Sequence, residues 1–286
     1  MNVYRALTLC ASLSFALIGC ALDDDPNSLM AAQAHARQIA AAARLQRIDI
    51  PTARYTIATF SRLQSADRPI RVYIEGDGLA WTQVDLPSLD PTPRQATGLL
   101  LAASDTSDNV VYLARPCQFV EGPARHGCRI PDWTDARFAS RIVDAENAAL
   151  DTFVARAPGQ GVELVGYSGG GAIAILMAAR RHDVMSIRTV AGNLESEAVN
   201  RLHKVSAMPA SLDPLNVVGR VATIPQVHFT GARDTVVPPV IAHDFVERIQ
   251  LSHGRCASTV VVPEMSHEGA WASVWPALLQ RPLCAT

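Results

Sequence analysis

The stretch LVGYSGGG, residues 164–171, constrains the fold more than any other part of the 286-residue sequence. An apolar run ends abruptly at Ser168, which has glycines close by on both sides. Glycine loses the most conformational freedom on folding, so it is favoured where a side chain would collide with a close neighbour. Gly-x-Ser-x-Gly between a buried strand and an Ala-rich helix predicts a nucleophile elbow, a sharp turn that presents the serine hydroxyl. The alternative is a glycine-rich turn with an idle serine.

Short β-rich runs alternate with helical stretches along most of the chain. This alternation is typical of the α/β class, with a mostly parallel central sheet and helices on both faces. Several runs are almost continuously apolar, as expected for strands that are buried on both sides. The expected strands are 54–60, 70–76, 109–115, 162–167, 186–191, 226–231 and 258–263. The expected helices are 27–47, 93–104, 134–156, 169–182, 239–252 and 270–280.

A serine nucleophile needs a base and an orienting carboxylate. His267, in PEMSHEGAW, lies just beyond the last expected strand, and Asp234 lies in the loop after the strand 226–231. Ser168, Asp234 and His267 then all follow the carboxyl ends of strands, where open α/β sheets place their sites. We therefore predict a catalytic triad of these three residues.

Other residues compete for two of these roles. Glu195 is the reserve acid, since Asp234 could instead cap a helix or a turn. His126 and His203 fall in the irregular stretches 117–133 and 192–221, which could form a pocket rim and a partial cap. The remaining histidines are more easily interpreted as surface or packing residues.

An oxyanion hole needs two N–H donors. The backbone N–H of Gly169, directly after the nucleophile, is the expected first donor. The loop YIEGDGLAW, residues 73–81, is expected to supply the second from Asp77 or Gly78. A carboxylate aimed into the hole would repel the anion, so we expect the Asp77 side chain to point away and hold the loop.

The segments YIEGDG, ARPCQ, GYSGGGA and AGN make the chain resemble the α/β-hydrolase superfamily, and more narrowly bacterial α/β-hydrolases that carry these segments. The resemblance implies a serine hydrolase, carboxylesterase-like or lipase-like, with no metal or organic cofactor. The chain departs from the His-Gly loop of many esterases, with Glu75 and Gly76 in its place. The alternatives are a ligand-binding or partner-binding lipoprotein without turnover, and a peptidase or thioesterase on the same fold.

The N-terminal segment predicts export. Residues 1–19 carry one cation, Arg5, and then an apolar run too short to span a bilayer comfortably. The segment ends in LIGC, which resembles the lipobox of bacterial lipoproteins, in which Cys20 is lipidated. Since Ala21 is not the aspartate associated with inner-membrane retention, we expect an outer-membrane lipoprotein facing the periplasm. The alternative is an ordinary cleaved signal.

The chain is thus divided into a signal peptide, residues 1–19, a lipid-attachment cysteine with an Ala-rich helical linker, residues 20–50, and an α/β-hydrolase domain, residues 51–286. Ser28 is the expected N-cap of the linker helix, and Pro51 marks its end. No interdomain linker follows.

Export changes how the cysteines are interpreted. Four remain after the signal and the lipid site, namely Cys117, Cys128, Cys256 and Cys284, an even number in an oxidising compartment. Of the three possible pairings we prefer Cys117–Cys128 and Cys256–Cys284, since each pair closes a moderate loop. Free buried thiols are the alternative, and no Cys/His cluster has zinc spacing.

Charge excludes one class of partner. The 25 basic and 27 acidic side chains are spread along the chain and give a formal net charge of -2, with no basic stripe for nucleic acid. The expected partners are a small-molecule or lipid ester substrate and the membrane that holds the lipid anchor.

Overall fold

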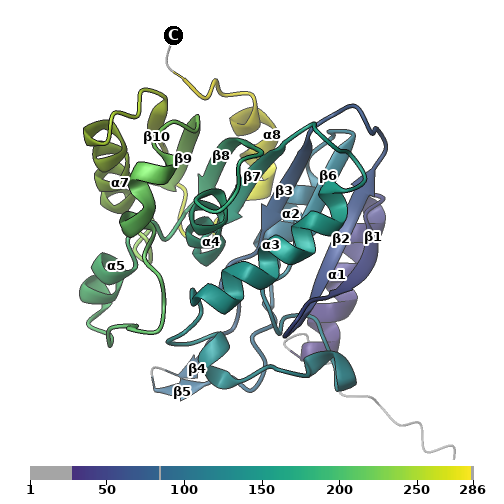
Figure 1. The fold of residues 1–286 in the computed structure, drawn as a ribbon. Helices are drawn as coiled ribbons and strands as arrows, with labels where there is room; N and C mark the ends of the chain where they lie inside the picture. Colours follow the sequence, from purple (N-terminus) through teal and green to yellow (C-terminus); the bar gives the residue numbers. More distant parts are fainter. Residues whose placement is uncertain (1–27, 84, 285–286) are drawn as a thin grey trace, which may run out of the picture.

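The computed structural model describes residues 28–83 and 85–284. Its centre is an eight-stranded sheet with the order β1-β2-β6-β3-β7-β8-β9-β10 (Figure 1). β2 is antiparallel to both neighbours, and the other pairs are parallel, which confirms the α/β class. A separate hairpin, β4–β5, follows β3. The strands are β1 (Gln46–Pro51), β2 (Thr56–Leu63), β3 (Ile70–Ile74), β4 (Trp81–Gln83), β5 (Leu86–Pro87), β6 (Asn109–Leu113), β7 (Val162–Tyr167), β8 (Val184–Val190), β9 (Gln226–Gly231) and β10 (Ala257–Val262).

Helices cover both faces of the sheet (Figure 1). Buried residues of α3, α4, α6 and α7 join one core cluster, and those of α1, α2 and α8 join the other. None of the helices within the described residues has the length and apolar character needed to cross a bilayer. The helices are α1 (Leu29–Ala42), α2 (Thr97–Ala103), α3 (Ser140–Val154), α4 (Gly169–Ala178), α5 (Ser196–His203), α6 (Val218–Val221), α7 (Pro239–Leu251) and α8 (Trp271–Leu279), with 3₁₀ turns η1 (Gly122–Arg125), η2 (Ile130–Asp132) and η3 (Pro214–Val217).

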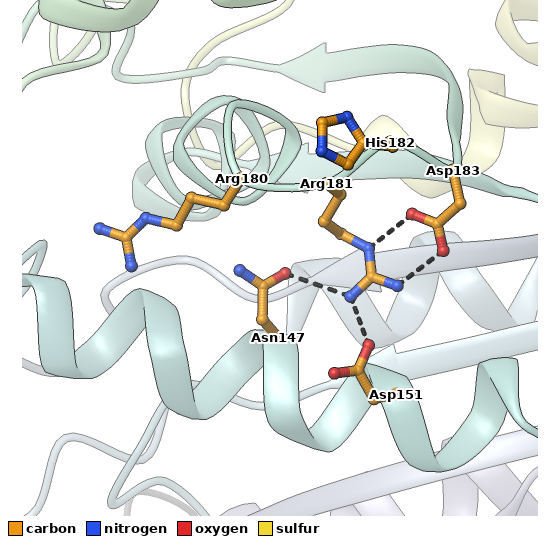
Figure 2. A pocket seen from close by; sticks show the side chains of 6 residues that line it. All are labelled: Asn147, Asp151, Arg180, Arg181, His182 and Asp183. Carbon is orange, nitrogen blue, oxygen red and sulfur yellow. Dashed lines mark hydrogen bonds and ion pairs between the residues drawn. The ribbon is translucent and has the colours of Figure 1, made fainter.

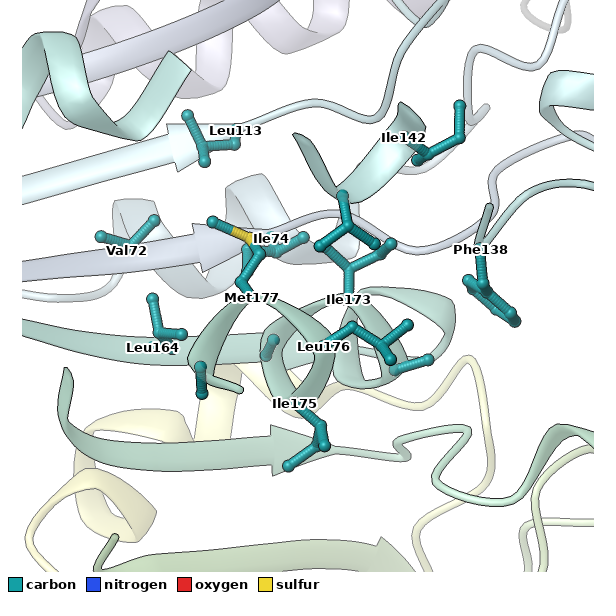
Figure 3. Packing of buried hydrophobic residues seen from close by; sticks show 14 of the residues in the cluster. Val72, Ile74, Leu113, Phe138, Ile142, Leu164, Ile173, Ile175, Leu176 and Met177 are labelled. Carbon is teal, nitrogen blue, oxygen red and sulfur yellow. The ribbon is translucent and has the colours of Figure 1, made fainter. Parts of the chain in front are cut away.

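The helix after the elbow is enclosed on all sides. Every residue of α4 is buried, and its Ile173 and Met177 share one cluster with Val72 and Leu164 of the neighbouring strands (Figure 3). Side chains packed at this density sit in defined rotamers and transmit small displacements to their neighbours. The first turn of α4 is therefore held in a fixed position beside the end of β7.

The N-terminal boundary differs from the expectation. The helix expected over 27–47 ends at Ala42, and residues 46–51 form β1, which pairs with β2 along its whole length. The last two positions of the expected helix, Gln46 and Arg47, join the sheet because β2 offers them backbone hydrogen bonds that outweigh local helix preference. The sheet therefore begins at Gln46, ahead of the expected domain start at 51. The expected signal segment 1–19 and lipid attachment at Cys20 lie outside the described residues.

The structure contains both preferred disulfides. The Cα atoms of Cys117 and Cys128 are 5.7 Å apart, and those of Cys256 and Cys284 are 4.7 Å apart. In the chain-entropy model a bridge that closes a loop of this size stabilises the fold by about 3 kcal/mol. The first bridge gathers the irregular stretch 117–133 against the sheet, and the second ties the C-terminal end of the chain to the start of β10.

One core residue carries a carboxyl group. Glu146 on α3 has no exposed surface, and neither of its carboxyl oxygens has a hydrogen-bond partner among the described residues. Burial raises the pKa of Glu146 to about 8, although Arg115, whose Nε lies 3.7 Å away, acts in the opposite direction. An isolated buried carboxylate is costly, so the protonated form is favoured in the folded protein at neutral pH.

This burial predicts a pH-dependent stability. Between the unfolded pKa of 4.5 and the folded value of about 8, the folded protein holds a proton that the unfolded chain has lost. The contribution of Glu146 to the free energy of unfolding therefore falls as pH rises through this window. Glu146→Gln cannot titrate, so its stability relative to the wild type should be higher at pH 8 than at pH 5. Urea unfolding at both pH values measures this difference.

A matched control is the exposed Glu247 on α7. Glu247→Gln should change the free energy of unfolding by a similar amount at both pH values. If Glu146→Gln behaved in the same way, the carboxyl group would not be titrating in the folded core.

Candidate active site

The strand β7 ends in a sharp turn at Ser168. Its backbone has φ of +51° and ψ of -119°, a left-handed conformation that is strained for a residue with a side chain. The Ser168 N–H donates to the carbonyl of Val190 at 2.9 Å. Its carbonyl accepts from the N–H groups of Gly171 and Asn193, both at 2.9 Å. Hydrogen bonds on both sides of the residue therefore hold the strained turn, and the elbow conformation is the one predicted.

The neighbouring glycines are required by contacts with the backbone. A Cβ on Gly166 would collide with the carbonyl of Gly170, and one on Gly170 would collide with the carbonyl oxygens of Ile74 and Glu75 at the end of β3. A Cβ on Gly171 would lie 2.8 Å from the Cα of Gly192. No rotamer change relieves a clash with backbone atoms, so this turn excludes any larger residue at these positions.

The structure brings the three expected triad residues together. The Nε2 atom of His267 lies 3.0 Å from the Oγ of Ser168, and its Nδ1 atom lies 2.8 Å from the Oδ2 of Asp234. Asp234 and His267 are buried, whereas Ser168 is half-buried. When Nδ1 carries the proton towards Asp234, Nε2 presents a lone pair to the serine hydroxyl. This arrangement can remove the proton from Oγ.

Separate contacts orient the two partners of Ser168. The second oxygen of Asp234 accepts from the N–H groups of Val236 at 2.9 Å and Val237 at 2.7 Å. The carbonyl of His267 accepts from the indole Nε1 of Trp271 at 2.9 Å and from the hydroxyl of Tyr167 at 3.2 Å. These bonds fix the loops after β9 and β10, so the spacing of the triad is set by the fold.

The reserve candidates lie in other contacts. Glu195 forms an ion pair of 3.3 Å with Arg201. His126 is exposed, and the Nε2 of His203 lies 2.7 Å from the carbonyl of Val236. None of these three candidates therefore lies beside Ser168 or beside the His267 ring.

His228 is buried inside β9, where its Nδ1 lies 2.8 Å from the Oγ1 of Thr189. Burial lowers its pKa to about 3, so it stays neutral. This agrees with its interpretation as a packing residue.

The loop after β3 lies against the elbow. Gly78 has φ of +67°, and a Cβ there would collide with the carbonyl of Pro91, so glycine is required. Within the described part of the chain, the backbone N–H groups of Asp77, Gly78 and Gly169 donate to no acceptor. Free N–H groups of this kind are what an oxyanion hole offers to a developing negative charge.

The Asp77 side chain does not point away from the elbow as expected, although its ion pairs do hold the loop as expected. A Cβ on Gly169 would meet the Asp77 carboxylate, so this group faces the elbow. Its Oδ1 forms a 3.0 Å ion pair with Nη1 of Arg115, and its Oδ2 forms a 2.9 Å ion pair with Nε of Arg137. Two opposite charges compensate the carboxylate, which explains how it can lie there.

Sequence reasoning missed this pair of arginines. Arg115 lies in the segment ARPCQ after β6 and is almost fully buried, with its guanidinium 5.4 Å from the ring centroid of Phe138. Arg137 precedes Phe138 and lies 5.2 Å from the same ring. The sequence signal for Arg115 was a cation at the end of an apolar strand, which alone does not show what it pairs with, and Arg137 lies in an irregular segment before α3.

Glu75 occupies the position where many esterases have histidine in the His-Gly loop. It is fully buried, and it accepts from the N–H groups of Gly76 at 2.9 Å and Gly98 at 3.1 Å and from the hydroxyl of Tyr112 at 3.1 Å. Burial raises its pKa, and these hydrogen bonds act against that rise. Glu75 therefore joins the loop to the start of α2 and holds its shape.

A separate surface hollow of about 460 Å³ lies between α3, the end of α4 and the start of β8 (Figure 2). It is at the amino edge of the sheet, opposite the triad. Nitrogens of Arg181 bind Asp183 at 2.8 and 2.7 Å and Asp151 at 2.6 Å. The guanidinium donors of Arg181 are already occupied by these ion pairs, which join α3 to the start of β8.

Comparison with known proteins supports the fold. No family model and no curated protein matches the sequence. Among solved structures, an acylaminoacyl peptidase from Pyrococcus horikoshii superposes with a TM-score of 0.56 at 11% identity. The match covers 78% of this chain but only 37% of the peptidase, so the chain spans less than half of that protein.

Two smaller proteins match over most of their length. An α/β serine hydrolase without a lid from Xanthomonas campestris has a TM-score of 0.53 at 14% identity, covering 85% of this chain and 96% of that one. A membrane phospholipase A, described as a bacterial virulence factor, has a TM-score of 0.53 at 16% identity, covering 88% and 91%. The sheet order, the elbow and these likenesses identify the chain as an α/β-hydrolase-fold protein.

Proposed function

We propose that this protein is a serine hydrolase that cleaves carboxylic esters. The observation that carries the proposal is the chain of contacts from Ser168 Oγ through the His267 ring to the Asp234 carboxylate, at 3.0 and 2.8 Å. A hydroxyl with a positioned base beside it and an orienting acid behind it is the arrangement that activates a serine. The esterases and peptidases that share the fold do not specify the substrate.

The reaction proceeds through an acyl-enzyme. Oγ of Ser168 bonds to the ester carbonyl carbon while Nε2 of His267 takes its proton, and the carbonyl electron pair moves onto oxygen. The N–H of Gly169 and an N–H of Asp77 or Gly78 stabilise this oxyanion. The C–O bond then breaks and the alcohol leaves with the proton from His267. Water attacks the acyl group by the same route, releases the acid and restores the serine.

We also propose that the protein is a lipoprotein of the bacterial cell envelope. The support is the LIGC segment with Cys20, preceded by an export-like segment, and the two disulfides, which suit an oxidising compartment. Acyl chains on Cys20 would hold the protein at the outer membrane, facing the periplasm. Mass spectrometry of the N-terminal peptide tests this proposal.

The triad assignment predicts selective labelling. A fluorophosphonate should bond to Ser168 with loss of fluoride, and Ser168→Ala should abolish both the labelling and ester hydrolysis. Asp234→Asn should lower kcat on the order of 10³- to 10⁴-fold, because the His267 ring loses its orienting charge. Mass-spectrometric mapping and kinetics on p-nitrophenyl esters measure these effects.

The exposed Ser140 at the start of α3 provides the control. Ser140→Ala should leave labelling unchanged. Absence of labelling in the folded wild type would contradict the hydrolase proposal and favour the ligand-binding alternative. Turnover of peptides or thioesters in preference to esters would change the substrate class and leave the triad roles intact.

The ion pairs of Asp77 predict a role for Arg137 in positioning. Arg137→Met replaces the guanidinium over the Phe138 ring with an uncharged side chain of similar length, and removes one of the two charges that hold Asp77 beside Gly169. Loss of a whole oxyanion donor lowers kcat about 10²- to 10³-fold, so displacement of the loop should lower kcat about 10-fold with little change in KM. Arg137→Lys should retain more of the activity. If stability fell while kcat stayed at the wild-type value, the arginine would serve only the fold.

A further inference from the structure

Exposed apolar side chains cluster around the β4–β5 hairpin. Leu89 is 83% exposed, Leu86 51% and Trp81 42%. Ile130, also exposed, opens the neighbouring turn η2. The segment is held to the body of the protein, since the indole Nε1 of Trp133 donates to the carbonyl of Ser88 at 3.1 Å. We call Trp81, Leu86, Leu89 and Ile130 the hairpin patch.

The hairpin patch lies at the edge of the sheet that carries the candidate active site. The hairpin follows the carboxyl end of β3, and a Cβ on Gly76, where this loop begins, would lie 3.4 Å from the Cβ of Ser168. Figure 1 shows β4 and β5 below the carboxyl ends of the parallel strands. The exposed apolar surface therefore lies at the same edge of the sheet as Ser168.

The first turn of α1 also lies at this edge. β1 is antiparallel to β2, which is antiparallel to β6, so β1 ends at the carboxyl edge of the parallel strands. α1 precedes β1 through a short turn and runs in the opposite direction, which places its first residues at the same edge (Figure 1). Met30, in the first turn of α1, is 73% exposed.

The length of the tether limits how the protein can sit on a membrane. The chain from the proposed lipidated Cys20 to Ser28 extends at most about 28 Å. A domain of about 250 residues has a radius of gyration of roughly 18 Å, hence a width of roughly 45 Å. A tether shorter than the domain keeps the edge that carries Ser28 nearer to the membrane than the opposite edge.

We propose that the carboxyl edge of the sheet docks on the lipid bilayer, with Trp81, Leu86 and Leu89 inserted at its surface. Tryptophan and leucine favour this position because the indole tolerates the polar headgroups while its ring and the aliphatic chain enter the apolar layer. This inference rests on the proposed hydrolase and lipoprotein functions and specifies their substrate class, an ester of a membrane lipid. The substrate then reaches Ser168 without leaving the membrane surface.

Charge does not supply the attraction. Arg94 and Arg129 are exposed near the hairpin patch, but so are Asp85 and Glu121. Apolar insertion therefore provides the contact, and docking should be nearly independent of salt, unlike the binding of a basic patch.

Tryptophan fluorescence tests the docking directly. Of the four tryptophans, Trp133, Trp271 and Trp275 are buried, so Trp81 alone can approach lipid. The full lipidated protein would be reconstituted in phosphatidylethanolamine–phosphatidylglycerol vesicles with or without bromines at acyl carbons 6 and 7. We expect brominated lipid to quench at least a fifth of the emission, and Trp81→Phe to lose this quenchable part. Equal emission in both kinds of vesicle would overturn the proposal.

A second measurement separates docking from catalysis. Leu89→Ser should lower the ratio of the rate on a vesicle-embedded phospholipid ester to the rate on a soluble short-chain ester at least fivefold. The matched control is Leu251→Ser, since Leu251 is 75% exposed at the end of α7, on the opposite edge. An unchanged ratio in Leu89→Ser would overturn the proposal.

The two proposals fail in different ways. If no ester of either kind is hydrolysed while Trp81 is quenched, the hydrolase function fails and the docking stands. The alternative to lipid is that a second copy of this chain covers the hairpin patch. Sedimentation velocity in detergent would then show a dimer that Leu89→Ser dissociates, and such a dimer without quenching would overturn docking.

Discussion

The site depends on the close approach of the first turn of α4 to the end of β3. The backbone at Gly170 lies so near the carbonyls of Ile74 and Glu75 that no side chain fits between them. This approach brings the loop after β3 beside Ser168, and the N–H of Gly169 finds no acceptor among the described residues. The strain of the positive φ at Ser168 persists because the hydrogen bonds with Val190, Gly171 and Asn193 surround it.

Around this contact the protein places several charged side chains close together. Asp77 carries a carboxylate to the elbow, and Arg115 and Arg137 compensate it. Behind them Glu146 lies buried with no hydrogen-bond partner in the described chain, and burial raises its pKa to about 8. Since charges interact more strongly away from water, displacement of one member should be felt by the others.

Three features that are far apart in the sequence lie at the same edge of the sheet. The triad residues, the exposed apolar hairpin patch and the first turn of α1 all lie where the parallel strands end. The triad residues and the hairpin patch lie on loops after parallel strands, which share an edge, and α1 begins at that edge because it runs opposite to β1. A proposed anchor at Cys20 and a proposed lipid substrate would thus meet the same face of the molecule.

The sequence alone determined the α/β class, seven of the eight sheet strands, and three triad positions that the structure brings into contact, because period, glycine spacing and strand ends are local signals. It also favoured the observed disulfide pairing through loop length. Only the tertiary structure decided that Gln46–Pro51 is a sheet strand, where the sequence had predicted helix as far as residue 47, and that Asp77 faces the elbow. Both depend on partners remote in sequence: β2 offers the hydrogen bonds that outweigh helix propensity, and two arginines supply the charge that lets a carboxylate lie beside Gly169.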